Sequence, residues 1–224
     1  MVNHTGNSSQ VLSNQDGPNA QLAECVTRHF NNAWREPLHP PSIRAFDELQ
    51  ALLNPGDERV LVLDSGCGTG ESTQNLAELH PQKTIIGIDR SAARLRRLPM
   101  GCLATRQGNC IWVRARLESF WRLVYGAGWE VGKHYILYPN PWPKSDQLNK
   151  RWHAHPVFPV VLALCGNIEL RTNWSIYAEE FARVIGWSTG KQPEVGLISP
   201  ERPISPFERK YAASAHQLFR LATQ

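Results

Sequence analysis

An apolar run that leads into a glycine-rich turn sets the strongest constraint on the fold of this chain. Residues 60–64 read Val-Leu-Val-Leu-Asp and are followed by three glycines at alternate positions, Gly66, Gly68 and Gly70. A strand buried on both faces is apolar throughout, not alternating. Glycine allows the sharp turn after it and lets backbone approach a ligand closely. The sequence therefore predicts a strand that delivers a glycine loop to the edge of a parallel sheet.

A second strand and an acid complete this pattern. Residues 71–79 carry apolar residues at helical spacing, and the apolar run 84–88 ends at Asp89. An acid at the tip of the second strand can accept hydrogen bonds from a ribose diol. The glycine spacing is not G-x-G-x-x-G, and no Walker lysine follows. The pattern indicates a nucleotide-shaped cofactor other than a dinucleotide or a nucleoside triphosphate.

The length and the spacing of the apolar runs predict one α/β domain. The chain has 224 residues, enough for a full core. We expect residues 21–224 to form a single doubly wound, mostly parallel sheet with a helical lead-in over 21–55. Residues 1–20, rich in Asn, Ser, Gln and Gly, are expected to be a disordered tail. Further strands are predicted at 110–114, 134–138, 168–171, 195–198 and 217–221.

Composition excludes several classes of protein. No stretch approaches the roughly 18 apolar residues of a membrane helix, and no signal sequence opens the chain. Five cysteines without CxxC spacing predict reduced thiols, a cytoplasmic location and no metal site. The net charge of +4 permits an RNA partner without requiring one. The oligomeric state is left open between monomer and homodimer.

A rigid polar loop follows the predicted strand at 134–138. Residues 139–144 read Pro-Asn-Pro-Trp-Pro-Lys. The two prolines around Asn140 fix the backbone on either side of its amide, and Trp142 offers an aromatic face beside it. In an open α/β sheet, ligands lie beyond the carboxyl ends of the strands. The loop therefore suits a planar nitrogen heterocycle, although Asn140 can also be read as a simple turn former.

These motifs resemble two nested groups of proteins. Asp64-x-Gly66-x-Gly68-x-Gly70 resembles the first motif of class I S-adenosylmethionine-dependent methyltransferases. The 139–144 loop resembles the P-D-P-W-P-K signature of the bacterial tRNA (guanine-N7-)-methyltransferase family. The segments 171–179 and 205–209 resemble its T-D-W…Y-A-E and T-x-F-E-x-R segments. The resemblance implies a Rossmann-like fold, S-adenosylmethionine as methyl donor and tRNA as acceptor.

The resemblance also implies roles for individual residues. The donor would be held by Asp64, Gly66, Cys67, Gly68, Gly70, Asp89 and Arg90. The acceptor base would be oriented by the catalytic residues Asn140, Asn173 and Glu208. Further substrate contacts would come from Trp142, Lys144, Lys150, Arg151, Thr172 and Trp174, with the aromatic rings stacking and the cations meeting phosphate.

Two departures from the family pattern keep other functions open. The family has aspartate where this chain has Asn140 and Asn173. A carboxylate accepts hydrogen bonds from both donors of the guanine edge, whereas an amide also donates, and losing a bidentate pair costs about 1–3 kcal/mol. The family's dense basic run after Lys144 is also thinned here. The alternatives are N-methylation of a small purine-like or heteroaromatic metabolite, and a non-catalytic RNA-associated protein that binds the cofactor.

Overall fold

The computed structural model describes residues 6–57 and 61–223, so Val60, the first residue of the first predicted strand, lies outside the described residues. The chain divides into two compact units. Unit 1 comprises residues 6–35, 138–162 and 169–223 of the described chain, and unit 2 comprises residues 36–137 and 163–168.

Unit 2 is built on five strands. They are β1 (Leu61–Ser65), β2 (Thr84–Asp89), β3 (Ala104–Gln107), β4 (Cys110–Arg114) and β5 (Val131–Leu137), in the spatial order β3-β4-β2-β1-β5. β1 is parallel to β2 and β5, and β2 is parallel to β4, whereas β3 runs antiparallel to β4. Every residue of β1 and β2 is buried, as their unbroken apolar runs predict.

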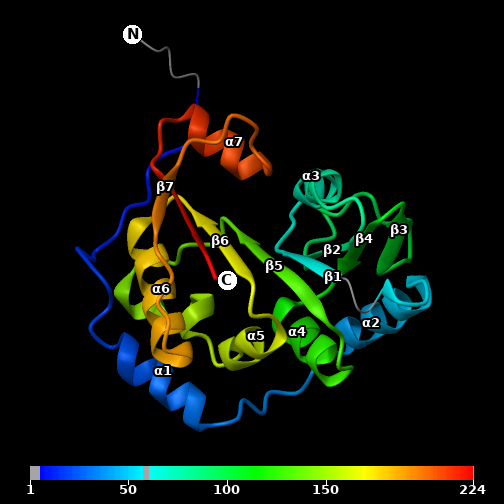
Figure 1. Cartoon of the computed structure of the whole chain (residues 1–224), viewed down its shortest axis with the longest axis horizontal. Coiled ribbons are helices and arrows are strands. Elements are labelled where there is room, and N and C mark those ends of the chain that lie inside the picture. The colour runs from blue at the N-terminus through cyan, green and yellow to red at the C-terminus, as the bar shows by residue number, and fades with distance from the viewer. Residues whose placement is uncertain (1–5, 58–60, 224) are drawn as a thin grey trace. The chain divides into compact units, whose positions relative to one another are not determined.

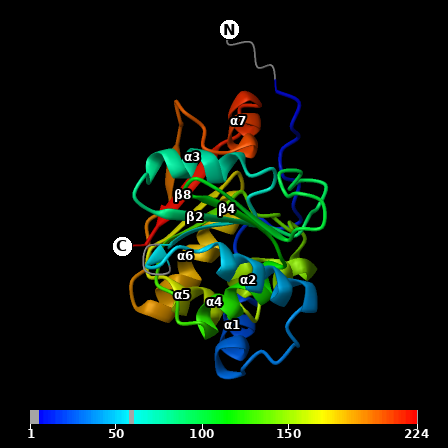
Figure 2. The ribbon, with the colours of Figure 1, turned by 90° about the vertical axis from the view of Figure 1, so that its right-hand side faces the viewer.

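Helices cover both faces of the unit 2 strands. α3 (Glu71–Leu79) lies on one face, and α2 (Pro40–Leu52) and α4 (Leu117–Gly126) lie on the other (Figure 2). The core side chains Leu76 of α3, Leu49 of α2 and Phe120 of α4 have no solvent exposure. Strand, helix and parallel strand alternate along the chain, which is the arrangement expected of a doubly wound α/β protein.

Unit 1 is built around a long helix and an antiparallel strand group. Its helices are α1 (Leu22–Asn31), α6 (Ser175–Thr189) and α7 (Pro206–Ala213), with the 3₁₀ segments η2 (Ser145–Lys150) and η3 (Trp152–Ala154). α5 (Phe158–Leu164) begins in unit 1 and ends in the unit 2 range. β8 (Leu218–Ala222) pairs antiparallel with β6 (Ile168–Thr172) and with β7 (Gly196–Ile198).

Residues 6–20 follow an extended path within unit 1. They run from α7 towards α1 (Figure 1), and the amide of Gly6 donates to the carbonyl of Ala213 at 3.1 Å. The predicted disordered tail covers residues 1–20. Its residues 1–5 lie outside the described residues, and Gly6, Ser8 and several of residues 13–19 make hydrogen bonds. The domain range 21–224 stays a prediction.

Two local features of the structure are not predicted by the sequence. Strand β3 has no sequence signal, because its Thr-Arg-Gln end is polar and only Ala104 is buried. Pro40 and Pro41 begin α2, where proline lacks only an N–H that has no helical partner. No helix among residues 6–57 and 61–223 is both long and apolar enough to cross a bilayer.

Candidate functional site

The glycine loop after β1 folds back onto the end of β2. The amides of Gly66 and Cys67 both donate to the carbonyl of Ile88, at 2.8 and 3.0 Å. Gly66 and Gly68 have φ values of 84° and 59°, a region that side chains rarely occupy. A Cβ added at either glycine would meet no atom of the described part of the chain within 4 Å. The loop therefore combines a left-handed backbone with open space beside it, which suits a ligand lying close to the chain.

Gly70 is required because a side chain at this position would collide with Trp112. A Cβ at Gly70 would lie 2.3 Å from Nε1 of Trp112, which donates to the Gly70 carbonyl at 3.3 Å. The guanidinium of Arg97 lies 5.1 Å above the Trp112 ring, and its Nε donates to the carbonyl of Thr69. Trp112 and Arg97 thus hold the end of the glycine loop from the side of β4.

Asp64 is a buried carboxylate whose two oxygens differ in their contacts. Its Oδ2 accepts from the hydroxyls of Ser72 and Thr73 at 2.6 and 2.7 Å, whereas Oδ1 has no hydrogen-bond partner among residues 6–57 and 61–223. Burial raises the pKa of Asp64 to about 6, although the two hydroxyls oppose the shift. A buried acceptor without a donor is costly, so the site favours a ligand that brings a positive charge or an N–H group.

Asp89 stands at the end of β2 and braces the glycine loop. Oδ2 accepts from the Gly68 amide at 3.1 Å and Oδ1 accepts from the Ser91 amide at 2.8 Å. An ionised carboxylate can accept about four hydrogen bonds, so it retains capacity for a diol. Arg90, the next residue, is exposed, and Arg94 Nη1 lies 3.7 Å from Oδ2.

Unit 2 therefore fits the predicted methyl donor. The unpaired Oδ1 of Asp64 matches a cationic group, the space beside Gly66 and Gly68 gives room, and Asp89 can hold ribose hydroxyls. The roles assigned to Asp64, Gly66, Cys67, Gly68, Gly70, Asp89 and Arg90 stay predictions that agree with this geometry.

The loop after β5 has an unusual backbone. Tyr138 and Trp142 have φ values of 50° and 46°, a region that bulky side chains rarely occupy. Asn140 lies between them and is exposed. Strain of this kind costs of order 1–3 kcal/mol per residue and persists only where surrounding contacts impose it, often at functional sites. The loop therefore presents Asn140 from a fixed, strained backbone.

Glu208 holds the beginning of this loop. Its Oε1 accepts from the Tyr138 hydroxyl and from Arg171 Nη1, both at 2.9 Å, and its Oε2 accepts from the Ile204 amide at 2.7 Å. Arg171 also pairs with Glu169. The Glu208 side chain has no solvent exposure. In this structure the carboxylate positions Tyr138 and Arg171, and the role of Glu208 in orienting the acceptor base stays a prediction.

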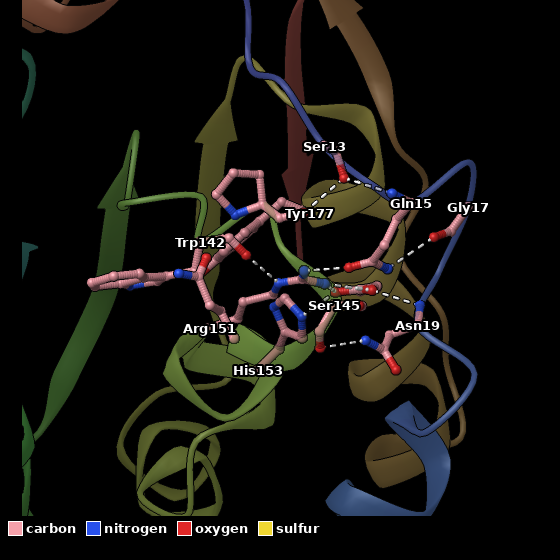
Figure 3. Close-up of polar contacts among 12 residues, drawn as sticks. Ser13, Gln15, Gly17, Asn19, Trp142, Ser145, Arg151, His153 and Tyr177 are labelled. Carbon is pink, nitrogen blue, oxygen red and sulfur yellow. Dashed lines mark hydrogen bonds and ion pairs between the residues drawn. The ribbon is translucent and has the colours of Figure 1, made fainter.

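Arg151 is buried and paired with a carboxylate. Its side chain has no solvent exposure, and Nη1 donates to both oxygens of Glu180 at 2.8 and 2.6 Å. Nε donates to the carbonyl of Trp142 at 3.1 Å (Figure 3). In this structure Arg151 positions the 139–144 loop, and its contact with a phosphate stays a prediction.

The remaining acceptor-side residues divide into buried and accessible ones. Thr172 is buried and its hydroxyl accepts from the Trp174 amide, and Trp174 is covered by Arg151, whose guanidinium carbon lies 4.8 Å from the ring. The substrate contacts of Thr172 and Trp174 stay predictions, and in this structure both side chains are buried. Lys144 and Lys150 are exposed as predicted, and Lys150 Nζ lies 4.7 Å from the half-buried Trp142 ring.

Asn173 is half-buried and bonded to a histidine that sequence reasoning missed. Nδ2 of Asn173 lies 3.0 Å from Nδ1 of His216, and Nε2 of His216 lies 3.1 Å from the carbonyl of Ser8. Because that carbonyl only accepts, Nε2 carries a proton, and in the neutral ring Nδ1 accepts from the Asn173 amide. This leaves Oδ1 of Asn173 as the atom that can accept from a bound base. An aspartate at 173 could not donate to His216.

Two other buried pairs of side chains could not be predicted from the sequence. His153 lies 2.8 Å from Glu180, and Ser65 lies 2.8 Å from His134. Burial opposes ionisation of Glu180, but His153 and Arg151 outweigh it and lower the pKa of Glu180 to about 2. Burial lowers the pKa of His134 to about 3. Partners so far apart in the chain have no spacing that could reveal them.

Taken together, the fold and the two sets of residues define a methyltransferase with a Rossmann-like α/β architecture. One solved structure, described as an antibiotic related methyltransferase, shares the fold with a TM-score of 0.55 and 18% identity, over 80% of this chain and 93% of its own. This confirms the predicted fold class.

Sequence comparison identifies the family. The profile of the family described as putative methyltransferase matches residues 58–221, and the chain belongs to that family. A tRNA (guanine-N(7)-)-methyltransferase of Leifsonia xyli subsp. xyli is 26% identical over 167 residues, covering 71% of this chain and 73% of its own length. Another, from Ectopseudomonas mendocina, is 27% identical over 218 residues, covering 91% and 87%.

Proposed function

We propose that this chain transfers a methyl group from S-adenosylmethionine to N7 of a guanine in tRNA. The observation that carries the proposal is the strained 139–144 loop, which presents Asn140 and Trp142 in a chain whose glycine loop suits the donor. Relatives named for this activity match most of the chain. A cytoplasmic location stays a prediction from the sequence.

The proposed reaction requires the protein mainly to bind the methyl donor and the guanine and to orient them. S-adenosylmethionine supplies a methyl group that its sulfonium already activates, and guanine N7 carries an exposed lone pair, so no base has to uncover the nucleophile. Alignment and exclusion of water then supply the rate. In unit 2, Asp64 compensates positive charge and Asp89 holds the ribose diol.

Unit 1 supplies the acceptor side of the proposal. Asn140 and Oδ1 of Asn173, whose Nδ2 is bonded to His216, each accept one hydrogen bond from the donors of the guanine edge. The Trp142 ring offers a stacking face. Lys144 and Lys150 meet tRNA phosphates, and with only two exposed cations in this loop the binding is weaker and less dependent on salt than for a dense basic run.

The direct test is methyl transfer to bulk tRNA with labelled S-adenosylmethionine, followed by digestion and nucleoside mass spectrometry. A panel of purine-like heterocycles is run in parallel. We expect 7-methylguanosine from tRNA and no product from the panel. Product only in the panel would assign the enzyme to a small metabolite, and no product in either would leave a cofactor-binding protein without catalysis.

A further inference from the structure

The N-terminal strap, residues 8–19 of unit 1, makes hydrogen bonds to His216, to the end of the 139–144 loop and to the Arg151–Glu180 pair. At its start, the Ser8 amide donates to Ser214 Oγ at 3.1 Å, and the Ser8 carbonyl accepts from His216 Nε2 at 3.1 Å. His216 in turn accepts from Asn173. The orientation of the Asn173 amide therefore depends on backbone supplied by the strap.

The middle of the strap is bonded to the end of the 139–144 loop. Ser13 Oγ donates to the Pro143 carbonyl at 2.7 Å. Asn14 and Ser145 bond reciprocally: the Asn14 side-chain amide donates to Ser145 Oγ at 3.2 Å, and the Ser145 backbone amide donates to Asn14 Oδ1 at 2.9 Å. These bonds fix the chain where the loop passes into η2.

The end of the strap completes the buried charge cluster. Gln15 Oε1 accepts from Arg151 Nη2, and the Asn19 amide donates to Glu180 Oε1 at 2.8 Å (Figure 3). The same guanidinium donates to the carbonyls of Trp142 and Lys144, at 3.1 and 3.2 Å. A buried ion pair is stable only when its remaining hydrogen-bonding groups are satisfied. The strap supplies two of those partners.

We propose that residues 8–19 are a positioning element for methyl transfer, which fixes Trp142 through Gln15 and Arg151 and fixes Asn173 through Ser8 and His216. The proposal rests on the proposed function for its effect on catalysis, whereas the ordering of the loop is a property of the protein alone. Because unit 2 carries the donor residues, the strap affects acceptor use and leaves donor binding unchanged.

Two truncations test the proposal. Removing residues 1–5 keeps every strap contact and serves as the matched control, and removing residues 1–19 deletes the strap. We expect the longer truncation to speed backbone hydrogen exchange in peptides covering 139–152 and 171–175, with exchange unchanged in the control. Methyl transfer should fall about tenfold or more in kcat, with the Kd for S-adenosylmethionine unchanged. Unchanged exchange in both peptides after loss of the strap would overturn the proposal.

Point variants keep the test decisive where the longer truncation does not fold. Gln15→Ala removes the acceptor for Arg151, Gln15→Glu retains one, and Gln10→Ala changes an exposed glutamine nearby in the same segment. We expect faster exchange at 139–152 and a lower kcat only in Gln15→Ala, with Gln15→Glu restoring both. Equal behaviour of Gln15→Ala and Gln10→Ala would contradict the role of the strap. If the wild type does not methylate tRNA, the proposed function fails, and the exchange data still decide whether the strap orders the loop.

Discussion

The Tyr138 hydroxyl donates a 2.9 Å hydrogen bond to Oε1 of Glu208, a carboxylate that is fully removed from solvent. Tyr138 is also the residue at which the chain leaves β5 with a φ of 50°. A strained backbone is kept only where contacts impose it. The bond to Glu208 therefore contributes to the conformation of the loop that carries Asn140.

Tyr138→Phe tests this relationship with little disturbance of the core. Glu208 keeps Arg171 and the Ile204 amide, so the free energy of unfolding should fall by only about 1 kcal/mol. Loosening of the loop should lower kcat for methyl transfer, measured beside donor affinity, which should not change. Tyr125→Phe on α4 alters an exposed tyrosine and is the control. An unchanged kcat in Tyr138→Phe would show that the bond does not orient the loop.

Comparing Gly68→Ala with Gly108→Ala distinguishes steric exclusion of the donor from the effect of backbone strain. The new methyl group would project into the open space beside the glycine loop, and the left-handed φ of 59° adds about 1–2 kcal/mol of strain. Gly108→Ala, at φ 61° and also without neighbours within 4 Å, carries the same strain in the turn between β3 and β4. We expect calorimetry to show donor affinity reduced about tenfold or more, or 1.4 kcal/mol, only for Gly68→Ala. Equal losses of donor affinity in both variants would show that the glycine loop is not part of the donor site.

Asp64 predicts how donor binding depends on pH. Its pKa is raised to about 6, so below that pH the carboxyl is largely protonated and carries no charge to attract a cation. Affinity for S-adenosylmethionine should therefore rise about tenfold from about pH 5 to about pH 7. Asp64→Asn should bind more weakly and show no such rise. A wild-type affinity that is flat over this range would contradict the assignment.

The raised pKa of Asp64 also makes the stability of the folded protein depend on pH. The folded protein holds the Asp64 proton up to about pH 6, whereas the unfolded chain releases it near 3.8. The native state thus binds more protons between these values, and the Asp64 contribution to stability falls as the pH rises through them. Glu180 acts in the opposite direction at lower pH: its pKa is lowered to about 2, so its contribution is present above 4.5 and is lost as the pH falls towards 2.

Lys144 and Lys150 predict the salt dependence of tRNA binding. Both are exposed beside the 139–144 loop, and each phosphate contact contributes about 0.7–0.9 to the slope of log K against log salt. Replacing both by alanine should weaken binding at low salt and reduce that slope by about 1.4–1.8. Lys191→Ala, an exposed lysine just beyond the end of α6, should leave the slope unchanged. Loss of the slope in the Lys191 variant instead would place the tRNA on another surface.

The sequence predicted the elements whose signals are local. β1, β2 and β4 were predicted within one or two residues, because continuous apolar runs between turn residues mark buried parallel strands. The glycine loop and Asp89 were recognised because their chemistry requires particular residue types in a fixed order. β3 was missed because an edge strand with one solvated face carries Thr, Arg and Gln.

The supporting residues of the candidate site had no such signal. In the sequence, Arg151 is one of two adjacent cations after a polar loop, a pattern typical of a protein surface. In the structure its side chain is buried and paired with Glu180. Glu208 and Tyr138 are 70 residues apart, and Asn173 and His216 are 43 apart. Tertiary pairing decides whether a charged residue meets solvent, substrate or a buried partner, and only the folded chain shows that pairing.

The most direct measurement is the amount of 7-methylguanosine formed per tRNA at saturating S-adenosylmethionine, by the wild type and by Asn140→Ala. We expect the wild type to form the modified nucleoside, and Asn140→Ala to form it about 10²-fold more slowly with donor affinity nearly intact. Formation of 7-methylguanosine at the wild-type rate by Asn140→Ala, or its absence from wild-type reactions in which a small heterocycle is methylated, would contradict the account.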